Sequence, residues 1–349
     1  MSMAGVSCYA TSVIYVANAD AKKISVFTLS ESSGLVNLLQ TLPVDGAIMP
    51  MALAPNKKIL YAAIRSIPYH LVVLDVDPTS GRLALRAKVP LVDNMANISI
   101  DHSGHYLFAA SYSGNSISVH TLDTQGIPLP NVQVLSTGSH PHQISAGPDN
   151  QFVYVSLLGD DRVDYFRLNS EESITDVLQP ILTPAVTLPS GSGPRHFVFS
   201  AKGNFLYVLN ELSGYVQVYA RRATDGSLAF VEHHQLMNGV KPWAADIHLT
   251  PQGDFLYASE RATSRLYGYR INSKNGRLNP IGSWETEAQP RAFTISPDGR
   301  FLVVAGQLSH RISIYAIHPL TGALQLLSSH KTGKNPAWVN MVNLSSSDH

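Results

Sequence analysis

The strongest constraint on the fold of this chain is an internal repeat, in which a run of alternating apolar residues recurs at nearly constant spacing. Three of the copies read PRHFVFSAKGNFLYVLN, PWAADIHLTPQGDFLYASE and PRAFTISPDGRFLVVAG. Successive copies are 45 to 53 residues apart and begin near Pro50, Met95, Pro141, Pro194, Pro242, Pro290 and Pro336. A period of this length is typical of proteins built from one supersecondary unit repeated along the chain.

Each repeat predicts four β-strands. The first two are alternating apolar runs joined by a tight turn, such as TPQG at 250–253 or SPDG at 296–299. A third run of the type VQVYAR or ISIYAI follows, and a turn that contains glycine leads into a fourth. Period-2 alternation, β-branched residues and turn residues all favour strands, and no segment shows sustained helical periodicity. The repeat therefore predicts an all-β fold, a β-propeller with four-stranded antiparallel blades.

The two ends of the chain predict the number of blades. The last repeat stops after one strand, PAWVNMV, while the N-terminal segment SVIYVANADAKKISVFTL reads as a second and a third strand. Together they complete one blade, so the ring should close by pairing the N- and C-terminal strands, which removes an exposed sheet edge. We therefore expect a single seven-bladed domain spanning residues 1–349, with the last few residues, LSSSDH, disordered.

Composition argues against several classes of partner. The chain has 25 basic and 25 acidic residues, whereas proteins that bind polyanions usually carry a basic excess. We therefore expect neither nucleic acid nor a membrane surface as a partner. Cys8 is the single cysteine, which excludes an intrachain disulfide framework and a cysteine-based zinc site. Because we recognise no signal peptide and no apolar run of about 20 residues, the expected location is cytoplasmic.

Strand polarity predicts where the charged residues of the repeat gather. In a propeller blade the innermost and second strands are antiparallel, so the start of the first lies at the same end of the channel as the end of the second. Arg195 and His196 begin the innermost strand of their blade, and Glu211 follows its second strand. We expect these side chains to meet at one mouth of the channel.

Equivalent positions in the other blades make this mouth cationic. The basic residues expected there are His142, Arg195, Arg261, Arg291 and Arg65, with Glu211 as the acid among them. A single arginine at a strand end is usually solvated, but five basic residues at equivalent positions are harder to explain in that way. Guanidinium groups match the geometry of phosphate and carboxylate, so the cluster predicts a small anionic ligand.

Neighbouring residues leave two interpretations open. His196 alternates away from Arg195 and either contacts the ligand or only forms a hydrogen bond within its own blade. Trp243 is either a core residue or an apolar wall of the site. Asp246 and His248 lie deeper along an innermost strand, where they could satisfy one another inside the channel.

Sequence motifs for other chemistry are missing. The chain contains no GxSxG elbow, no Walker loop and no dinucleotide fingerprint after a strand. Histidines and carboxylates do not cluster at metal-ligand spacing, and the mouth has too few acids for a hard cation. We therefore expect no metal and no cofactor.

Several segments carry a family resemblance. GSGPRHFVF, LYVLNELSGYVQVY, WAADIHLTPQGDFLYASERATS, QPRAFTISPDGRFLVVAGQLSHRISIY and NPAWVNMVN closely resemble the bacterial lactonase family with the seven-bladed propeller fold. The resemblance runs from the VIYVANA strand to Asn343, and the best-known members are the propeller-type 6-phosphogluconolactonases. It implies hydrolysis of a phosphosugar lactone, 6-phospho-D-glucono-1,5-lactone, to 6-phospho-D-gluconate in the pentose phosphate pathway. We expect the chain to act as a monomer or a weak homodimer.

The resemblance also implies site residues. The family is similar to the fungal carboxy-muconate lactonizing enzymes, which are credited with an active-site group of one histidine, two arginines and one glutamate. Matched by motif, these correspond to His142, Arg195, Arg261 and Glu211. The chain departs from the pattern in NMANIS, where Asn97 stands in place of a histidine, and this departure could alter substrate preference.

Lactone hydrolysis assigns a role to each expected residue. His142 is the candidate general base, with Glu211 either orienting it or taking its place. Arg195 and Arg261 would stabilise the carbonyl oxygen as it gains charge. The expected substrate-binding residues are Arg65, Arg291, Trp243 and His196, of which the first two would hold the phosphate. A muconate-type cycloisomerase, another sugar lactonase and a non-catalytic scaffold remain the alternatives.

Overall fold

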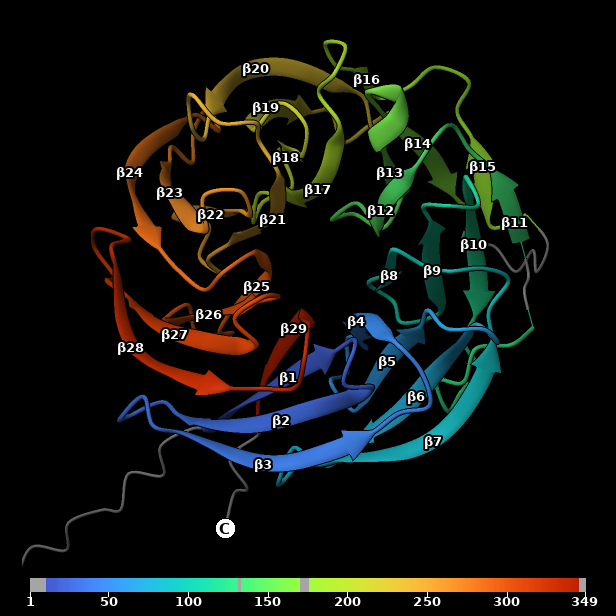
Figure 1. Ribbon diagram of the computed structural model, residues 1–349. Helices are drawn as coiled ribbons and strands as arrows, with labels where there is room; N and C mark the ends of the chain where they lie inside the picture. The colour runs from blue at the N-terminus through green and yellow to red at the C-terminus, as the bar shows by residue number, and fades with distance from the viewer. Residues whose placement is uncertain (1–10, 131–132, 170–175, 345–349) are drawn as a thin grey trace, which may run out of the picture.

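The computed structural model describes residues 11–130, 133–169 and 176–344, and within these ranges the strands form seven sheets around a central channel (Figure 1). Each sheet contains four antiparallel strands, and one sheet also carries a short fifth strand. The predicted seven-bladed β-propeller is therefore confirmed. Cys8 and residues 345–349 of the predicted disordered tail lie outside the described residues. No helix in the described ranges is long and apolar enough to cross a membrane.

The strands have equivalent places in the seven sheets. The innermost strands are β4 (Ile48–Leu53), β8 (Asn97–Ile100), β12 (Pro141–Ala146), β17 (Pro194–Phe199), β21 (Ala244–Leu249), β25 (Pro290–Ile295) and β29 (Pro336–Asn343). The second strands are β5 (Ile59–Ile64), β9 (Tyr106–Ser111), β13 (Phe152–Leu157), β18 (Phe205–Asn210), β22 (Phe255–Glu260), β26 (Phe301–Gly306) and β1 (Thr11–Asn18). The third strands are β6 (His70–Val76), β10 (Ser116–Thr121), β14 (Arg162–Leu168), β19 (Tyr215–Arg221), β23 (Arg265–Ile271), β27 (Arg311–Ile317) and β2 (Lys23–Ser30).

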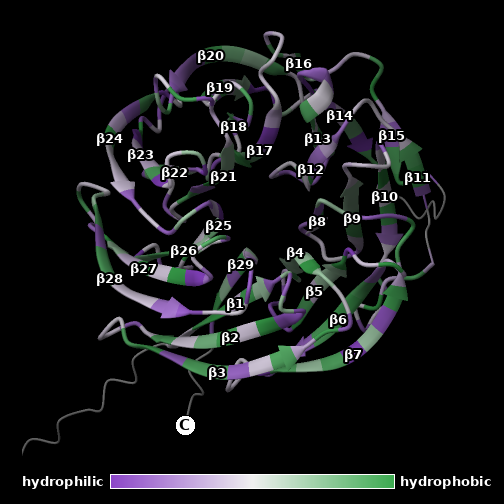
Figure 2. Ribbon diagram, in the orientation of Figure 1, coloured by the Kyte–Doolittle hydropathy of each residue, from purple (hydrophilic) through white to green (hydrophobic). Residues whose placement is uncertain are grey.

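The outermost strands complete the sheets. They are β7 (Leu83–Pro90), β11 (Gln133–Ser136), β15 (Leu178–Pro180), β20 (Leu228–Gln235), β24 (Leu278–Glu285), β28 (Leu324–Lys331) and β3 (Val36–Pro43). The short strand β16 (Val186–Thr187) also pairs with β14, and a 3-10 helix, η1 (Leu158–Asp160), follows β13. Hydrophobic and hydrophilic residues alternate along outermost strands such as β7 (Figure 2), as expected where one face of a strand meets solvent.

The ring closes through the two ends of the chain, as predicted. Strand β29 is the innermost strand of the sheet whose other members are β1, β2 and β3. It pairs with β1 in an antiparallel register in which Ser12 lies opposite Asn343. The hydroxyl of Ser12 also donates a hydrogen bond of 2.8 Å to Oδ1 of Asn343. This pairing leaves no unpaired strand edge between the first and last repeats.

Tyrosines of the second strands connect one sheet to the next. The hydroxyl of Tyr207 donates a hydrogen bond of 3.1 Å to the carbonyl of Gly276, in the turn before the outermost strand of the next sheet. Gly276 has φ +72°, and a Cβ there would lie 2.4 Å from the ring of Phe205, so the turn requires glycine. The same bond occurs between Tyr15 and Gly81, Tyr61 and Gly126, Tyr154 and Gly226, and Tyr257 and Gly322. These bonds explain the recurring tyrosine and glycine of the sequence repeat.

Candidate functional site

β-Bulges at the start of the innermost strands position three of the predicted residues. In β17 the register shifts between Pro194 and His196, which leaves Arg195 as the extra residue of a bulge. The same shift occurs around His142 in β12 and around Arg291 in β25. A bulge bends its strand and re-aims the extra side chain. The bulges thereby turn His142, Arg195 and Arg291 toward one end of the channel. Five sheets contribute residues to this end, which we call the cationic mouth: His142, Arg195, Glu211, Arg261, Arg291 and Arg65.

The carboxylate of Glu211 joins two buried guanidinium groups. Its Oε2 lies 2.8 Å from Nε of Arg195 and 3.0 Å from Nη2 of Arg261. The two arginine side chains are 1% and 2% exposed, and that of Glu211 is 17% exposed. Arg195 also donates through Nη1 to the carbonyl of Ala245. The β17–β18 hairpin therefore brings together the cation and the anion at its two ends, and the neighbouring sheet of β21–β24 adds Arg261 to the pair.

Trp243 and the backbone beside it hold Arg261 in place. The guanidinium donates from Nε to the carbonyl of Trp243 and from Nη2 to that of Ala244, both at 3.1 Å. Its Cζ lies 4.0 Å from the centre of the Trp243 ring, within range of a cation–π interaction. The tryptophan is 39% exposed, so it forms a wall of the mouth, and the alternative that it is a core residue is wrong.

Glu260, which the sequence did not single out, supports the same arrangement. It is fully buried, and its Oε1 accepts a hydrogen bond of 2.6 Å from the backbone N–H of Trp243. Its Oε2 accepts bonds from the backbone N–H and the hydroxyl of Thr263. The buried carboxylate therefore fixes the segment that precedes β21 against the turn that follows β22. Its place directly before Arg261 is the signal that could have indicated a supporting role.

The electrostatics of the mouth reflect an excess of positive charge. Burial raises the pKa of Glu211, but the charges of Arg195, Arg261 and Arg291 outweigh it and hold this pKa below its usual value. Burial and the charge of Arg195 lower the pKa of Arg261 to about 9, so its guanidinium stays protonated at neutral pH. Burial, Arg195 and Arg261 likewise lower the pKa of Arg291. An anionic ligand would offset the electrostatic repulsion among these arginines.

Arg65 and Arg291 line a cavity of about 310 Å³ at the mouth. The buried Nε of Arg291 has no hydrogen-bond partner among the described residues. Arg65 donates to the amide oxygen of Asn94. Asp20 lines the same cavity, and its carboxylate accepts a hydrogen bond of 3.1 Å from Asn335. The cavity therefore offers two guanidinium groups to an anion, and its volume lies at the lower end of the range for small-molecule sites.

His142 is buried beside the cations of the mouth. Its ring contacts those of Tyr112 and His196, at centroid distances of 5.9 and 5.1 Å. Its Nδ1 is buried and has no hydrogen-bond partner in the part of the chain that the structure describes. Burial, together with the charges of Arg195 and Arg291, holds the pKa of His142 well below its usual value. The imidazole is therefore neutral near pH 7 and retains a nitrogen lone pair.

His196 lies behind His142 and lines the channel. Its Nδ1 is 2.7 Å from Oδ1 of Asp246 on β21, and Nε2 of His248 is 3.2 Å from Oδ2 of the same carboxylate. The predicted pairing of Asp246 with His248 is confirmed. The hydrogen bond of His196 crosses to the neighbouring sheet, because the innermost strands β17 and β21 are in contact. The expectation of a bond within its own blade is therefore wrong.

The channel below the mouth contains a second cavity, of about 370 Å³. His196, Asp246, His248 and Asn97 are among the residues that line it. The amide oxygen of Asn97 accepts a hydrogen bond of 3.2 Å from the backbone N–H of Ile144, so the position that departs from the family pattern lies in the channel. Within the described ranges, no group of three or more His, Cys, Asp or Glu side chains is arranged to hold a metal ion.

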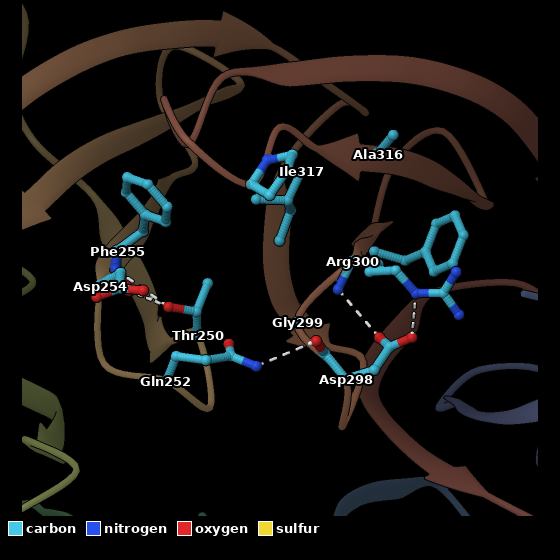
Figure 3. A pocket seen from close by; sticks show the side chains of 11 residues that line it. Thr250, Gln252, Asp254, Phe255, Asp298, Gly299, Arg300, Ala316 and Ile317 are labelled. Carbon is cyan, nitrogen blue, oxygen red and sulfur yellow. Dashed lines mark hydrogen bonds and ion pairs between the residues drawn. The ribbon is translucent and has the colours of Figure 1, made fainter.

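A groove of about 500 Å³ lies between the sheet of β21–β24 and the sheet of β25–β28, at the strand ends that are opposite to the mouth (Figure 3). Thr250 and Phe255 line one side of it, and Asp298 and Arg300 line the other. The guanidinium of Arg300 is already paired with the carboxylates of Asp298 and Glu31. The groove is larger than either channel cavity, but it lacks the uncompensated charge that distinguishes the mouth.

Comparisons with known proteins agree with this architecture. Residues 6–341 match the family described as "Lactonase, 7-bladed beta-propeller". The chain is 36% identical over 334 residues to a 6-phosphogluconolactonase of Serratia proteamaculans, covering 95% of this chain and 98% of that protein. It is 36% identical over 337 residues to a 6-phosphogluconolactonase of Yersinia pseudotuberculosis, covering 94% and 97%. The structure of a periplasmic gluconolactonase from Pseudomonas aeruginosa is similar with a TM-score of 0.89 at 28% identity, covering 96% and 99%.

Proposed function

Because the chain belongs to the lactonase family of seven-bladed β-propellers, we propose that it hydrolyses 6-phospho-D-glucono-1,5-lactone to 6-phospho-D-gluconate, a step of the pentose phosphate pathway. The observation that carries the proposal is the uncompensated charge of the cationic mouth. Arg195 and Arg261 share the single carboxylate of Glu211, while Arg65 and Arg291 have no carboxylate within ion-pair distance among the described residues. A doubly charged phosphate is an anion of the kind that such a site requires.

Arg65 and Arg291 bind the phosphate in this proposal. They line the mouth cavity of about 310 Å³, and the buried Nε–H of Arg291 is a donor without a partner among the described residues. Guanidinium groups hold phosphate oxygens through two parallel hydrogen bonds, which fixes orientation as well as position. With the phosphate held there, the lactone ring extends toward Arg195, Arg261 and His142.

Arg195 and Arg261 act on the carbonyl. Attack by water turns the carbonyl oxygen into an oxyanion, and positioned cationic donors stabilise that charge more than they stabilise the substrate. Glu211 fixes both guanidinium groups before the substrate arrives, with contacts of 2.8 and 3.0 Å. The exposed face of Trp243 gives the sugar ring an apolar surface beside Arg261.

His142 is the general base in this proposal, and Glu211 is a positioning residue. The carboxylate of Glu211 is held by two buried guanidinium groups, so taking up a proton would disrupt both ion pairs. His142 is neutral, and its buried Nδ1 has no partner in the described structure. A neutral imidazole at the mouth is therefore the better acceptor for the proton of the attacking water.

Acid release from freshly prepared 6-phosphoglucono-1,5-lactone, followed in a pH-stat and corrected for spontaneous hydrolysis, tests the proposal. Wild-type protein should accelerate the reaction. His142→Ala and Arg195→Lys should each lower kcat/KM at least tenfold, while the matched control His234→Ala, on the outermost strand β20, should behave as wild type. A wild-type protein that releases no acid contradicts the function, and wild-type rates in both site variants contradict the residue assignment.

A substrate panel separates the alternatives. Glucono-1,5-lactone, which lacks the phosphate, should be hydrolysed with a higher KM, and a carboxymuconate should not react. Turnover of the carboxymuconate alone would favour a cycloisomerase, and no turnover of any compound would favour a scaffold. The cytoplasmic location, the single domain over residues 1–349 and the monomeric or weakly dimeric state remain part of the proposal and can be measured independently.

A further inference from the structure

A buried carboxylate that the proposed mechanism does not use lies directly behind the mouth. Asp246 is 5% exposed, and its oxygens accept hydrogen bonds from the backbone N–H groups of Ile247 and Phe293 at 3.0 and 3.1 Å. Its other contacts are Nδ1 of His196 at 2.7 Å and Nε2 of His248 at 3.2 Å. Burial raises the pKa of Asp246, but the two histidines and their hydrogen bonds outweigh it and hold this pKa well below its usual value. Asp246 is therefore ionised at neutral pH.

The ionised carboxylate determines the tautomer of His196. A carboxylate only accepts hydrogen bonds, so Nδ1 of His196 must carry the proton and Nε2 must carry the lone pair in the neutral ring. That Nε2 is buried and has no hydrogen-bond partner among the described residues. The ring of His196 packs against His142 at 5.1 Å and against Trp338 at 5.8 Å. His196 therefore presents a buried proton acceptor next to the proposed general base.

The proposed base needs such an acceptor. When His142 takes a proton from water it becomes a cation, and Arg195, Arg261 and Arg291 all act against a positive charge at that position. Glu211, the acid of the mouth, is already engaged with two of those arginines. His196 lies between His142 and the ionised carboxylate of Asp246: its Nδ1 is 2.7 Å from Asp246, and its ring centroid is 5.1 Å from that of His142.

We propose that His196 and Asp246 form a proton relay behind His142 during lactone hydrolysis. The inference rests on the function proposed above. As the water oxygen bonds to the carbonyl carbon, His142 accepts a proton at one ring nitrogen and passes a proton from the other, directly or through one water, to Nε2 of His196. The imidazolium of His196 is then paired with the carboxylate of Asp246. When the bond between the carbonyl carbon and the ring oxygen breaks, the proton returns along the same path to the ring oxygen, and the product acid loses its own proton to solvent.

Both imidazoles of the relay are neutral before the reaction. Burial and Arg195 lower the pKa of His196 to about 4 and also lower the pKa of His142, so neither ring holds an extra proton at neutral pH. The charged and titratable groups that face the relay are Tyr112, Arg195, Arg261 and Arg291 at the mouth, and His248 on the channel side. Asp246 acts through His196 and is a positioning residue.

Kinetics of Asp246→Asn and His196→Gln test the relay. Both variants should lower kcat for 6-phosphoglucono-1,5-lactone at least tenfold, with KM and the affinity for 6-phosphogluconate within twofold of wild type. In mixtures of H₂O and D₂O, a plot of wild-type kcat against the deuterium fraction should be curved, as expected when two protons move in the rate-limiting step. The same plot should be linear for the two variants. His234→Gln, which removes a histidine–carboxylate contact with Glu232 on the outermost strand β20, serves as the matched control and should stay within threefold of wild type.

The possible outcomes separate this inference from the proposed function. An inactive wild-type protein contradicts the function itself, whereas an active wild type with unchanged kcat in folded Asp246→Asn and His196→Gln overturns only the relay. If either variant fails to fold, nuclear magnetic resonance of wild-type protein with ¹⁵N-labelled histidine decides. The relay requires His196 to carry its proton on Nδ1 at neutral pH, and protonation of Nε2 alone would overturn it.

Discussion

Replacing Glu211 with glutamine is the perturbation whose effect can be worked out most fully from the structure. The carboxylate lies 2.8 Å from Arg195 and 3.0 Å from Arg261, and both arginine side chains are at most 2% exposed. Glutamine keeps the shape and one acceptor oxygen but loses the negative charge. Two guanidinium groups that water cannot reach would then repel one another without compensation. Removing one partner of a buried ion pair costs about 3–5 kcal/mol, so we expect Glu211→Gln to lower the free energy of unfolding by this amount.

Equilibrium unfolding in urea measures this loss. Glu285→Gln provides the matched control, because Glu285 pairs with Arg265 at 3.3 Å while its side chain is 88% exposed. An exposed ion pair contributes about 0–1 kcal/mol, so the control should be nearly as stable as wild type. If Glu211→Gln and Glu285→Gln lost the same small amount of stability, the carboxylate of Glu211 would not be the compensating charge of the mouth.

The pH dependence provides a second check on the same residue. The pKa of Glu211 is lowered in the folded protein, so the carboxylate contributes stability above its unfolded pKa of about 4.5. That contribution is lost as the pH falls through the lower folded pKa. The difference in stability between wild type and Glu211→Gln should therefore be constant near neutral pH and shrink in acid. A difference that grew on acidification would contradict the assigned direction of the pKa shift.

Three further predictions concern the neighbouring groups. Arg291→Gln should raise KM for 6-phosphoglucono-1,5-lactone at least tenfold but change KM for glucono-1,5-lactone, which lacks the phosphate, less than twofold. Equal effects on the two substrates would argue against phosphate binding at Arg291. Trp243→Leu removes the ring that lies 4.0 Å from the guanidinium of Arg261 and should lower kcat/KM three- to tenfold, with Trp243→Phe restoring part of the rate. The pKa of His196 is about 4 in the folded protein, compared with 6.5 for an ordinary histidine. As the pH falls from 6.5 to 4 the unfolded chain takes up the proton and the folded protein does not, so the protein loses stability. Wild type should therefore lose about 3 kcal/mol relative to His196→Gln across that range, as measured by urea unfolding at several pH values.

The sequence predicts the ring of blades because period-2 alternation and turn residues are local properties of the chain. Antiparallel pairing of the first two strands then places Arg195 and Glu211 at one end of the channel, so the composition of the cationic mouth follows from strand polarity. The N- and C-terminal fragments of one blade predict the pairing of β1 with β29 in the same way.

Other features depend on contacts between segments that are distant in the sequence. The bulges at His142 and Arg195 are shifts in hydrogen-bond register, which a pattern of side chains does not encode. The contact between His196 and Asp246 spans 50 residues and arises because neighbouring innermost strands converge on the channel. Glu260 accepts a hydrogen bond from the backbone N–H of Trp243, 17 residues earlier in the same repeat, and its position before Arg261 is the sequence signal of that role.

A crystal structure of the protein with bound 6-phosphogluconate would show whether the cationic mouth is the site of hydrolysis. We expect the phosphate of the product against Arg65 and Arg291, and its new carboxylate against Arg195 and Arg261. Product bound in the groove lined by Thr250 and Arg300, or held without contact to any of these four guanidinium groups, would contradict the assignment of the cationic mouth as the site of hydrolysis.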